Sequence, residues 1–331
     1  MRCSLAVALP LLFATGAACA ADMRLGTGLL LVEPGQAAPV IDLRDTAANG
    51  NAWGLGISGW TLSGSIERPV ERGRRVFLSA ALTPYNAHSS RRRYRDGARA
   101  RDLEYDSGSY LLRGGMRVRA GEHHTTEIAA VVGREVIGDD APAAIRRAWR
   151  SPYAGFTWLQ RYRRVAADDP LAGRIHGVEM SSLVEMYAGN RLWSRLTLTE
   201  TAGRPVGRIQ LRQTAMLFEG SGLDRVSAFP IGGSWDVLGA SAVYGSHYAE
   251  YFPSRGIVIN GGADYVFARS WEAGARISAF RSRSVMRKGA ALQTTVRLGG
   301  LRVTTGVAVA IGPGERHTIV YAALSAAAFE R

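Results

Sequence analysis

The stretch LRVTTGVAVAI at residues 301–311 decides the fold. Leu301, Val303 and Val307 fall on one face of an extended chain, whereas Arg302 and Thr304 fall on the other. This alternation with a period of two is typical of a β-strand whose two faces meet different surroundings. The same alternation recurs in GIVINGGADYVFA (256–268), WEAGARISAF (271–280), AALQTTVRL (290–298) and HTIVYAALSAAAF (317–329).

The connections between these segments are short, as at Arg269-Ser270 and Gly299-Gly300. Short connections between amphipathic strands indicate a meander of hairpins, which suits a closed antiparallel barrel. Two kinds of barrel fit this pattern. A soluble barrel would turn the apolar face inward, whereas a membrane barrel would turn it outward to lipid and line its lumen with the polar face.

The N-terminal segment favours the membrane barrel. A charged start, an apolar run at 5–13 and the small residues Ala18-Cys19-Ala20 predict a secretory signal peptide over residues 1–20, with the barrel over 21–331. An alternative is that Cys19 is a lipidated first residue. Because the rest of the chain has no apolar run long enough for a spanning helix, we expect a barrel in the outer membrane of a Gram-negative bacterium.

The whole chain predicts an all-β fold, a transmembrane antiparallel up-and-down barrel of about 14 strands, within a range of roughly 12 to 16. With the first strand running outward, the long connections 33–51, 84–107 and 219–255 all fall on the outside, and both termini are expected in the periplasm. The expected strands are 23–32, 52–66, 73–83, 108–120, 123–137, 149–165, 173–188, 191–201, 206–218, 256–267, 271–284, 289–298, 301–311 and 317–329.

The formal net charge is +13, and the basic residues are 40 arginines and the single lysine Lys288. A GC-rich genome explains the preference for arginine over lysine, but it does not explain the excess of positive charge. That excess indicates an anionic partner: lipopolysaccharide phosphates, an acidic polymer, or an anionic solute in the lumen.

Alternation assigns a set of charged side chains to the lumen. They form either a network of ion pairs that stiffens a narrow barrel or a pathway that favours anions, and both interpretations stay open. Aromatic residues near strand ends are candidates for the interfacial girdles, namely Trp53, Tyr110, Tyr153, Tyr187, Tyr265, Trp271 and Tyr321. The expected lumen residues are Arg113, Arg117, Arg119, Glu127, Glu179, Glu185, Arg208, Arg212, Asp264, Glu272, Arg276, Arg297 and Arg302.

The loop 84–107 contains a run of arginines at Arg91, Arg92, Arg93 and Arg95. This run is either a solvated loop or a contact for lipopolysaccharide phosphates. We expect no nucleic-acid partner, because an exported chain does not meet one.

The loop 219–255 has 37 residues, far more than hairpin loops usually have. Its apolar residues are unlikely to stand free in water, so the sequence predicts that the loop folds inward and partly plugs the lumen. The residues singled out for this plug are Phe229, Gly232, Gly233, Trp235, Asp236 and Gly239.

The segment Phe229-Pro230-Ile231-Gly232-Gly233 is followed by five strands. In this the chain resembles the BamA/TamA family of outer-membrane assembly barrels, which carry a Phe-x-x-Gly-Gly segment in a long sixth loop with five strands after it. The resemblance covers about the last 110 residues. It implies a barrel acting in transport or translocation, inserted by the outer-membrane assembly machinery. The chain departs from the family pattern at 237–240, which lacks the tip arginine. Because the expected barrel takes up residues 21–331, we expect no POTRA domains.

A third hypothesis is enzymatic. His88 and Ser90 are spaced to lie on one face of a strand, as in the His-x-Ser pairs of outer-membrane lipid hydrolases that the segment resembles. No metal or cofactor is expected, because the other histidines lack metal-ligand spacing.

For the whole chain, we expect a transport or translocation barrel with a basic, partly plugged lumen. A passive anion-preferring porin and an outer-leaflet lipid hydrolase are the alternatives.

Overall fold

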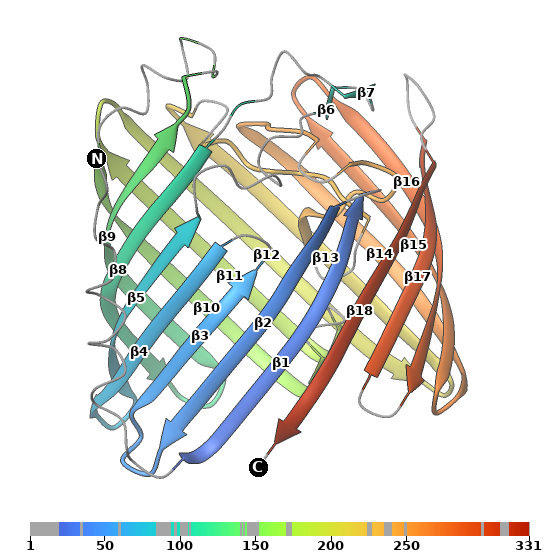
Figure 1. The fold of residues 1–331 in the computed structure, drawn as a ribbon, viewed down its shortest axis with the longest axis horizontal. Coiled ribbons are helices and arrows are strands. Elements are labelled where there is room, and N and C mark those ends of the chain that lie inside the picture. The colour runs from blue at the N-terminus through green and yellow to red at the C-terminus, as the bar shows by residue number, and fades with distance from the viewer. Residues whose placement is uncertain are drawn as a thin grey trace.

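A closed antiparallel β-barrel forms the body of the protein in the computed structural model (Figure 1). The structure describes residues 20–330 except 34–35, 59–60, 84–93, 96–97, 100–104, 106, 140, 142, 144–151, 170–173, 224–226, 235–239, 248–249, 299–300 and 312–317. The wall strands are β1 (Ala20–Glu33), β2 (Gln36–Ala47), β3 (Ala52–Ser58), β4 (Thr61–Glu71), β5 (Arg74–Thr83), β8 (Ser107–Ala120), β9 (His124–Ile137), β10 (Tyr153–Asp169), β11 (Arg174–Ala188), β12 (Leu192–Val206), β13 (Ile209–Ser221), β14 (Arg255–Ala268), β15 (Trp271–Ser282), β16 (Met286–Leu298), β17 (Leu301–Ile311) and β18 (Thr318–Glu330). A small separate hairpin consists of β6 (Tyr94–Arg95) and β7 (Ala98–Arg99).

The first and last strands close the sheet. β1 and β18 pair antiparallel, from Leu25 opposite Ala328 to Leu31 opposite Ala322. Each wall strand in the described part of the chain therefore has a hydrogen-bonded neighbour on both sides, which removes the edges that an open sheet would expose. The predicted fold class, an all-β up-and-down barrel, is confirmed.

The two rims of the barrel differ. One rim, called here the short-turn rim, is formed by the turns 48–51, 72–73, 121–123, 207–208 and 269–270, and β1 begins and β18 ends at it (Figure 1). Gly73, Gly121 and Gly207 take φ values of 77°, 73° and 60° in these turns, a conformation that side chains with a Cβ rarely adopt. Strands β5, β9 and β13, after which the long connections begin, end at the opposite rim. We expect the short-turn rim to face the periplasm.

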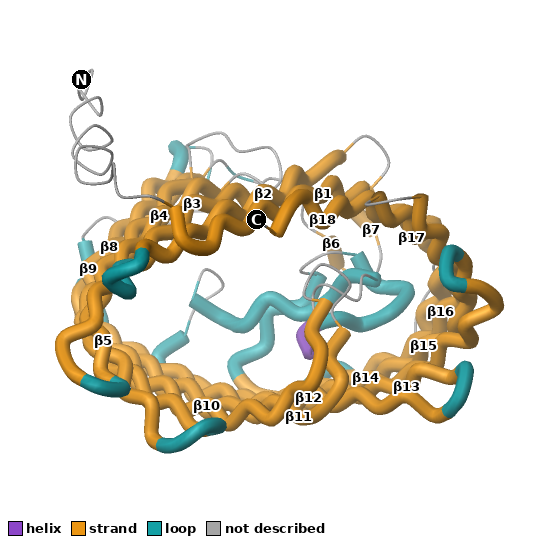
Figure 2. Tube along the Cα trace, turned by 90° about the horizontal axis from the view of Figure 1, so that it is seen from below, coloured by secondary structure: helices purple, strands orange, loops and turns teal. Residues whose placement is uncertain are grey.

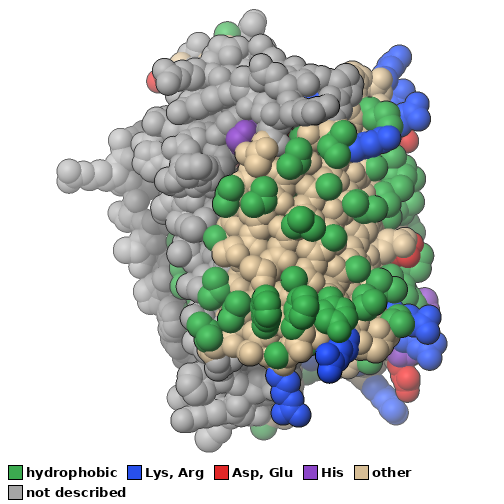
Figure 3. Space-filling model, turned by 90° about the vertical axis from the view of Figure 1, so that its right-hand side faces the viewer, with side chains coloured by type: hydrophobic (Ala, Val, Ile, Leu, Met, Phe, Trp, Pro, Cys, Tyr) green, Lys and Arg blue, Asp and Glu red, His purple; other side chains and the backbone are tan. Residues whose placement is uncertain are grey.

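The two faces of the wall have opposite polarity. Leu292 is 70% exposed on the outside, whereas its neighbour Gln293 is 6% exposed on the inside. Ile277 and Val320 likewise point outward next to inward-facing Arg276 and Tyr321. Figure 3 shows the resulting apolar side chains over the outer wall, with arginine and lysine at both its upper and its lower edge. An apolar outer face with a polar inner face is the pattern of a membrane barrel rather than a soluble one.

Within the described residues the wall contains sixteen strands, two more than the 14 expected, at the upper end of the predicted range. The expected loop 33–51 is wrong, because most of it forms β2, and the expected single strand 52–66 is divided into β3 and β4. Pro39 within β2 weakened the strand pattern in the sequence, since proline cannot donate to a strand ladder. Both differences fall between β1 and β5, so the direction of every later strand is as predicted.

The described part of the chain contains no helix that is long and apolar enough to cross a membrane.

Candidate functional site

A column of ion pairs lies on the inner face of β4, β5, β8 and β9. Arg117 contacts Glu127 at 2.7 Å and Glu67 at 2.5 Å, and Arg75 contacts Glu67 at 3.1 Å. Arg113 also pairs with Glu127, whose side chain is 2% exposed. Three guanidinium groups therefore share two carboxylates, and the column keeps a positive charge.

Neutral groups hold the column in place. The guanidinium of Arg113 donates to the Thr157 hydroxyl at 3.1 Å. The Phe77 ring lies 5.4 Å from the guanidinium of Arg113 and 5.5 Å from that of Arg117. A ring in this position attracts each cation by about 0.5–1 kcal/mol and adds no charge of its own.

A second basic cluster lies where the lumen meets the short-turn rim. Arg161 and Arg163 on β10 share the carboxylate of Glu179 on β11, at 3.3 and 3.1 Å. Arg119, at the end of β8, donates to two carbonyl oxygens of the 121–123 turn at 3.2 and 2.9 Å. The inner face of β10 therefore continues the positive charge of the column to the mouth.

Nearer the long-loop rim, Arg195 forms a two-pronged ion pair with Glu185, at 2.7 and 2.8 Å. The Tyr187 hydroxyl donates to the same carboxylate at 3.1 Å, and the Trp193 ring lies 5.3 Å from the Arg195 guanidinium. Tyr187 and Trp193 pack together with ring centres 4.2 Å apart. Aromatic rings therefore flank this ion pair, in which the Arg195 side chain is 24% exposed and that of Glu185 10%.

The inner face of β14–β17 holds the most deeply buried charges. Arg276 donates to both carboxylate oxygens of Asp264, at 2.6 and 2.8 Å, and the two side chains are 0% and 1% exposed. A Cβ added at Gly274 would overlap Asp264, so the pair depends on the glycine beside it. Nearby, Glu272 pairs with Arg302 at 2.7 Å and lies 4.0 Å from Arg297.

The described residues of 227–251, called here the inner loop, run across the inside of the barrel (Figure 2). The loop makes short antiparallel bridges with itself, between Ile231 and Tyr251 and between Gly233 and Val243. Gly232 and Gly233 take φ values of 131° and 106°, which explains the glycine pair predicted to matter here. The 219–255 loop expected to fold inward thus has a described part that lies within the lumen.

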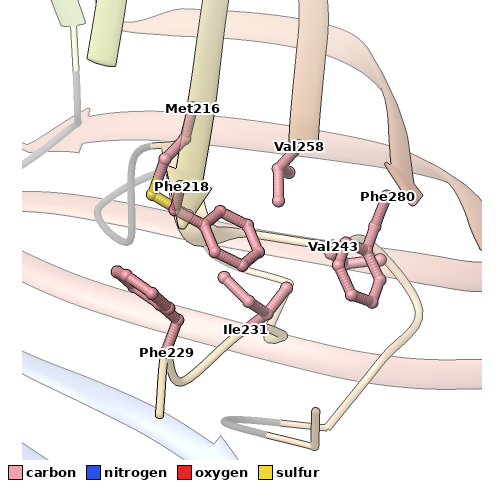
Figure 4. Close-up of a cluster of buried hydrophobic side chains, with 7 residues drawn as sticks. All are labelled: Met216, Phe218, Phe229, Ile231, Val243, Val258 and Phe280. Atoms are coloured by element: carbon pink, nitrogen blue, oxygen red, sulfur yellow. The ribbon is translucent and has the colours of Figure 1, made fainter. Parts of the chain in front are cut away.

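An apolar cluster fixes the inner loop to the wall (Figure 4). Loop residues Phe229, Ile231 and Val243 pack on the wall side chains Phe218 and Phe280, and Met216 and Val258 complete the cluster. The rings of Phe218 and Phe229 have centres 4.6 Å apart. Burial of each large apolar side chain stabilises the packed loop by about 1.5–3 kcal/mol, so the loop is held firmly on this wall.

Small wall residues let the loop approach the sheet closely. The backbone N–H of Tyr244 donates to the Ser278 hydroxyl at 2.9 Å, and Arg212 donates to the Tyr244 hydroxyl at 3.3 Å. A Cβ at Gly289 would overlap the Tyr244 carbonyl oxygen, and one at Gly245 would overlap the backbone of Ala310. The seat of the loop is therefore built from glycine, serine and alanine on β15–β17.

Tyr251 fastens the far end of the inner loop. Arg287 on β16 donates to the Tyr251 hydroxyl at 2.8 Å, and the ring packs against Phe280 with centres 5.3 Å apart. Burial raises the pKa of Tyr251 above its ordinary value, and the neighbouring Glu250 acts in the same direction, whereas the Arg287 hydrogen bond opposes it. The phenol therefore stays neutral at physiological pH.

The opposite wall keeps open space. A cavity of about 740 Å³ is bounded by β2–β5 and β8–β10, and its charged lining is Arg44, Asp45, Glu67, Arg75, Arg113, Arg117 and Arg161. A second cavity of about 870 Å³ lies at the short-turn rim beside Arg119, Arg161 and Arg163. Space for a solute and an excess of arginine thus occur on the same side of the lumen.

Several expected site residues lie elsewhere or outside the described residues. Arg208 was expected on a lumen face and is wrong, because the strand ends at Val206 and Arg208 is exposed in the 207–208 turn. Arg95 belongs to the small β6 hairpin. His88, Ser90, Arg91, Arg92, Arg93, Trp235, Asp236 and Gly239 lie outside the described residues, so the lipid-hydrolase and lipopolysaccharide hypotheses stay predictions.

The aromatic girdle was only partly predicted. Tyr265 and Trp271 face outward with Phe267 between them, the rings 4.8 Å apart at each contact, and Tyr110 is exposed. Tyr187 and Tyr321 are wrong as girdle residues because both are buried inside. Tyr153 packs on Tyr187 and Trp193 and therefore also belongs to the interior, whereas Trp53 lies opposite Ile66, which is exposed on the outer face.

Sequence reasoning missed five residues of the ion-pair network, namely Glu67, Arg75, Arg161, Arg163 and Arg195. Arg161 and Arg163 share a face with Thr157 in an expected strand, and this spacing was a usable signal. The run Arg163-Arg164 obscured the alternation. Glu67 was hidden because residues 67–72 were expected to form a turn, whereas Arg75 lies in the expected strand 73–83.

Comparisons with known proteins place the fold. No family model matches the chain, and no curated protein matches it in sequence. Among solved structures, BamA from Haemophilus ducreyi lacking POTRA domains 1–3 aligns at a TM-score of 0.68 and 8% identity, over 92% of this chain and 69% of that one. CdiB from Acinetobacter baumannii aligns at a TM-score of 0.60 and 10% identity, over 93% and 60% of the two chains.

CdiB from Escherichia coli aligns at a TM-score of 0.59 and 12% identity, over 92% of this chain and 63% of that one. The chain thus spans about three fifths of the length of either CdiB. At these identities the likeness concerns the fold alone. The resemblance to BamA-type barrels that the last third of the sequence suggested is confirmed at that level: this chain folds as a sixteen-stranded barrel of that kind.

Proposed function

We propose that the protein is an outer-membrane barrel that passes an anionic substrate through its lumen. The substrate moves along the arginine-lined wall of β2–β10, and the inner loop narrows the passage from the opposite wall. The outer-membrane location rests on the apolar outer face, and the role in translocation rests on the fold shared with BamA and CdiB.

One observation carries the proposal. The inner loop packs on the β13–β17 wall through Ile231, Val243 and Tyr244, while the opposite wall keeps the cavity of about 740 Å³ beside Arg113 and Arg117. A loop that served only to fill the barrel would be expected to pack against both walls. The lumen is therefore restricted on one side and open on the other.

The charges of the open wall favour anions. Its arginines outnumber its carboxylates, and Glu127 and Glu67 are each shared between two guanidinium groups. In a narrow lumen such an excess lowers the energy of an anion and raises that of a cation. The ion-pair network and the anion pathway are then formed by the same residues, in which the carboxylates hold the arginines in place.

Planar-bilayer recordings of the purified barrel test the proposal. We expect a small unitary conductance, because the loop narrows the lumen, and a reversal potential in a salt gradient that shows preference for chloride. A conductance as large as that of an unobstructed sixteen-stranded pore would contradict the restriction. A preference for potassium would contradict the arginine pathway.

A passive anion-preferring porin is the second candidate, favoured by the same excess of arginine. The two functions differ in how the current depends on the solute. A porin passes any small anion at a rate set by size, whereas a translocation barrel shows current that is blocked at low concentration by its own substrate. Titration of the open channel with candidate polyanions separates them.

A further inference from the structure

The mouth of the lumen at the short-turn rim has a composition unlike the rest of the passage, and the inference drawn from it rests on the proposed function. A cavity of about 870 Å³ opens there between β8, β9 and β10. It is lined by Arg119, Glu122, His123, Thr125, Arg161, Arg163, Arg164, Val165 and Ala166.

The strand register sets three guanidinium groups around this cavity. Arg119 lies opposite Thr125, and Thr125 lies opposite Arg161 on the next strand. Neighbouring strands are about 4.8 Å apart, so the backbones of Arg119 and Arg161 are about 10 Å apart. Arg163 follows Arg161 on the same face at about 7 Å, and its backbone N–H donates to the His123 carbonyl at 2.8 Å. The three arginines therefore frame one opening.

Charge at this mouth is less compensated than in the deeper column. Among the side chains that the structure describes, four arginines line the cavity, against Glu122, which is 90% exposed on the turn, and Glu179, which Arg161 and Arg163 share. Within the described residues no carboxylate contacts Arg119, whose hydrogen bonds go to turn carbonyls. The deeper column instead encloses Glu127 among its arginines. The mouth thus keeps guanidinium groups facing open space.

A guanidinium fork matches the planar carboxylate, and several forks at fixed spacing suit a chain that repeats this group. We infer that this mouth binds a carboxylate-bearing polysaccharide as it enters the lumen, which names the substrate class of the proposed passage. A polypeptide is a poorer match. Peptides bind sheets through free strand edges or apolar sockets, whereas the described strands form a closed sheet and only Val165 and Ala166 are apolar in the lining.

Binding of labelled polygalacturonate oligomers to the detergent-purified barrel, followed by fluorescence anisotropy, tests the inference. We expect binding that weakens as salt is raised, because charge pairs at an open mouth are screened. The combined variant Arg119→Gln, Arg161→Gln and Arg163→Gln should weaken binding at least about tenfold, because it removes three guanidinium groups that form charge-assisted hydrogen bonds with carboxylates. The matched control is Arg204→Gln with Arg208→Gln, two exposed arginines at the same rim outside the cavity, which should change binding less than twofold.

Arg119→Glu guards against a folding artefact, because this exposed side chain contacts only turn carbonyls and the variant should fold as the wild type does. It should weaken binding severalfold. Unchanged binding in both variants overturns the site. Polyglutamate of equal length binding as tightly as polygalacturonate overturns the polysaccharide class, and equal binding of neutral dextran overturns the role of charge. The anisotropy experiment measures binding and no current. A barrel without anion preference in the bilayer recordings would therefore contradict the proposed anion passage, whereas the binding site at the mouth would stand or fall by the anisotropy experiment alone.

Discussion

The inner face of β13–β17 and the inner face of β4–β10 belong to one sheet but meet different surroundings. The first carries Met216, Phe218 and Phe280 among small residues, and the inner loop covers it. The second carries arginines and glutamates, and it borders open cavities. The composition of the inward face therefore decides whether a stretch of wall is covered by chain or left to solvent.

The same difference changes what an ion pair is worth. Asp264 and Arg276 lie on the covered wall at 1% and 0% exposure, whereas Glu179 and Arg161 lie on the open wall at 28% and 47% exposure. A charge without its partner is costly where water cannot reach it and cheap where water can. Ion pairs on the covered wall should therefore contribute more to stability than those on the open wall, along which we propose the passage.

The largest effect expected is from Asp264→Asn on the covered wall. Removing this carboxylate leaves the buried Arg276 guanidinium without its counter-charge, which should lower the free energy of unfolding by about 3–5 kcal/mol. Urea unfolding in detergent, followed by tryptophan fluorescence, measures it. The matched change on the open wall, Glu179→Gln, should cost less than about 1 kcal/mol. Equal losses in the two variants would mean that the covered wall is not drier than the open one.

Replacing residues 227–251 by a short glycine–serine linker should raise the unitary conductance severalfold, because the replacement removes the chain that narrows the lumen. The larger channel should still prefer anions, since the arginines of the open wall remain. Planar-bilayer recording gives both values. An unchanged conductance would show that the inner loop does not restrict the passage, and a preference for cations would show that the arginines do not face it.

A smaller effect is expected from Gly289→Ala, which places a Cβ against the Tyr244 carbonyl and should lift the loop tip from its seat. Brief openings of higher conductance should become more frequent, with the barrel still folded. Gly261→Ala is the control, because its Cβ would be 3.5 Å from Ile277 on the outer face, an ordinary contact. If the frequency of channel openings changes equally in the two variants, the close contact between Gly289 and Tyr244 does not hold the loop in place.

The smallest effect is expected from Arg117→Gln on the open wall. The change leaves Glu67 and Glu127 with fewer positive neighbours, so the anion-to-cation permeability ratio should fall about twofold at physiological salt, where charges interact over about 8 Å. Reversal potentials report this ratio. Arg74→Gln, an exposed arginine paired with Glu71 at the rim, should leave it unchanged. A ratio that rises in Arg117→Gln would reverse the assignment of the pathway.

The resemblance in the sequence anticipated where the long loop enters the barrel, with five strands after it, and the structure has β14–β18 in that place. Which side chains contact each other was harder to anticipate from the sequence than which face of a strand each residue occupies. Glu127 and Arg117 come from neighbouring strands whose register, Arg117 opposite Glu127, follows from a short turn. Arg113 and Thr157 meet although they are 44 residues apart, and no local pattern links them.

By itself the sequence determined that this chain is a barrel of amphipathic strands, because alternation with a period of two is a local property of each strand. The same alternation assigned most of the charged lumen residues to the inner face; Arg208 is an exception, because it lies in the turn between β12, which ends at Val206, and β13, which begins at Ile209. Tertiary structure alone decided the division of the lumen into a covered and an open wall. That division depends on whether apolar side chains of a loop pack against small and apolar residues of distant strands. Val243 and Tyr244 do so beside Phe280 and Gly289. Such complementarity cannot be recognised in any single segment of the sequence.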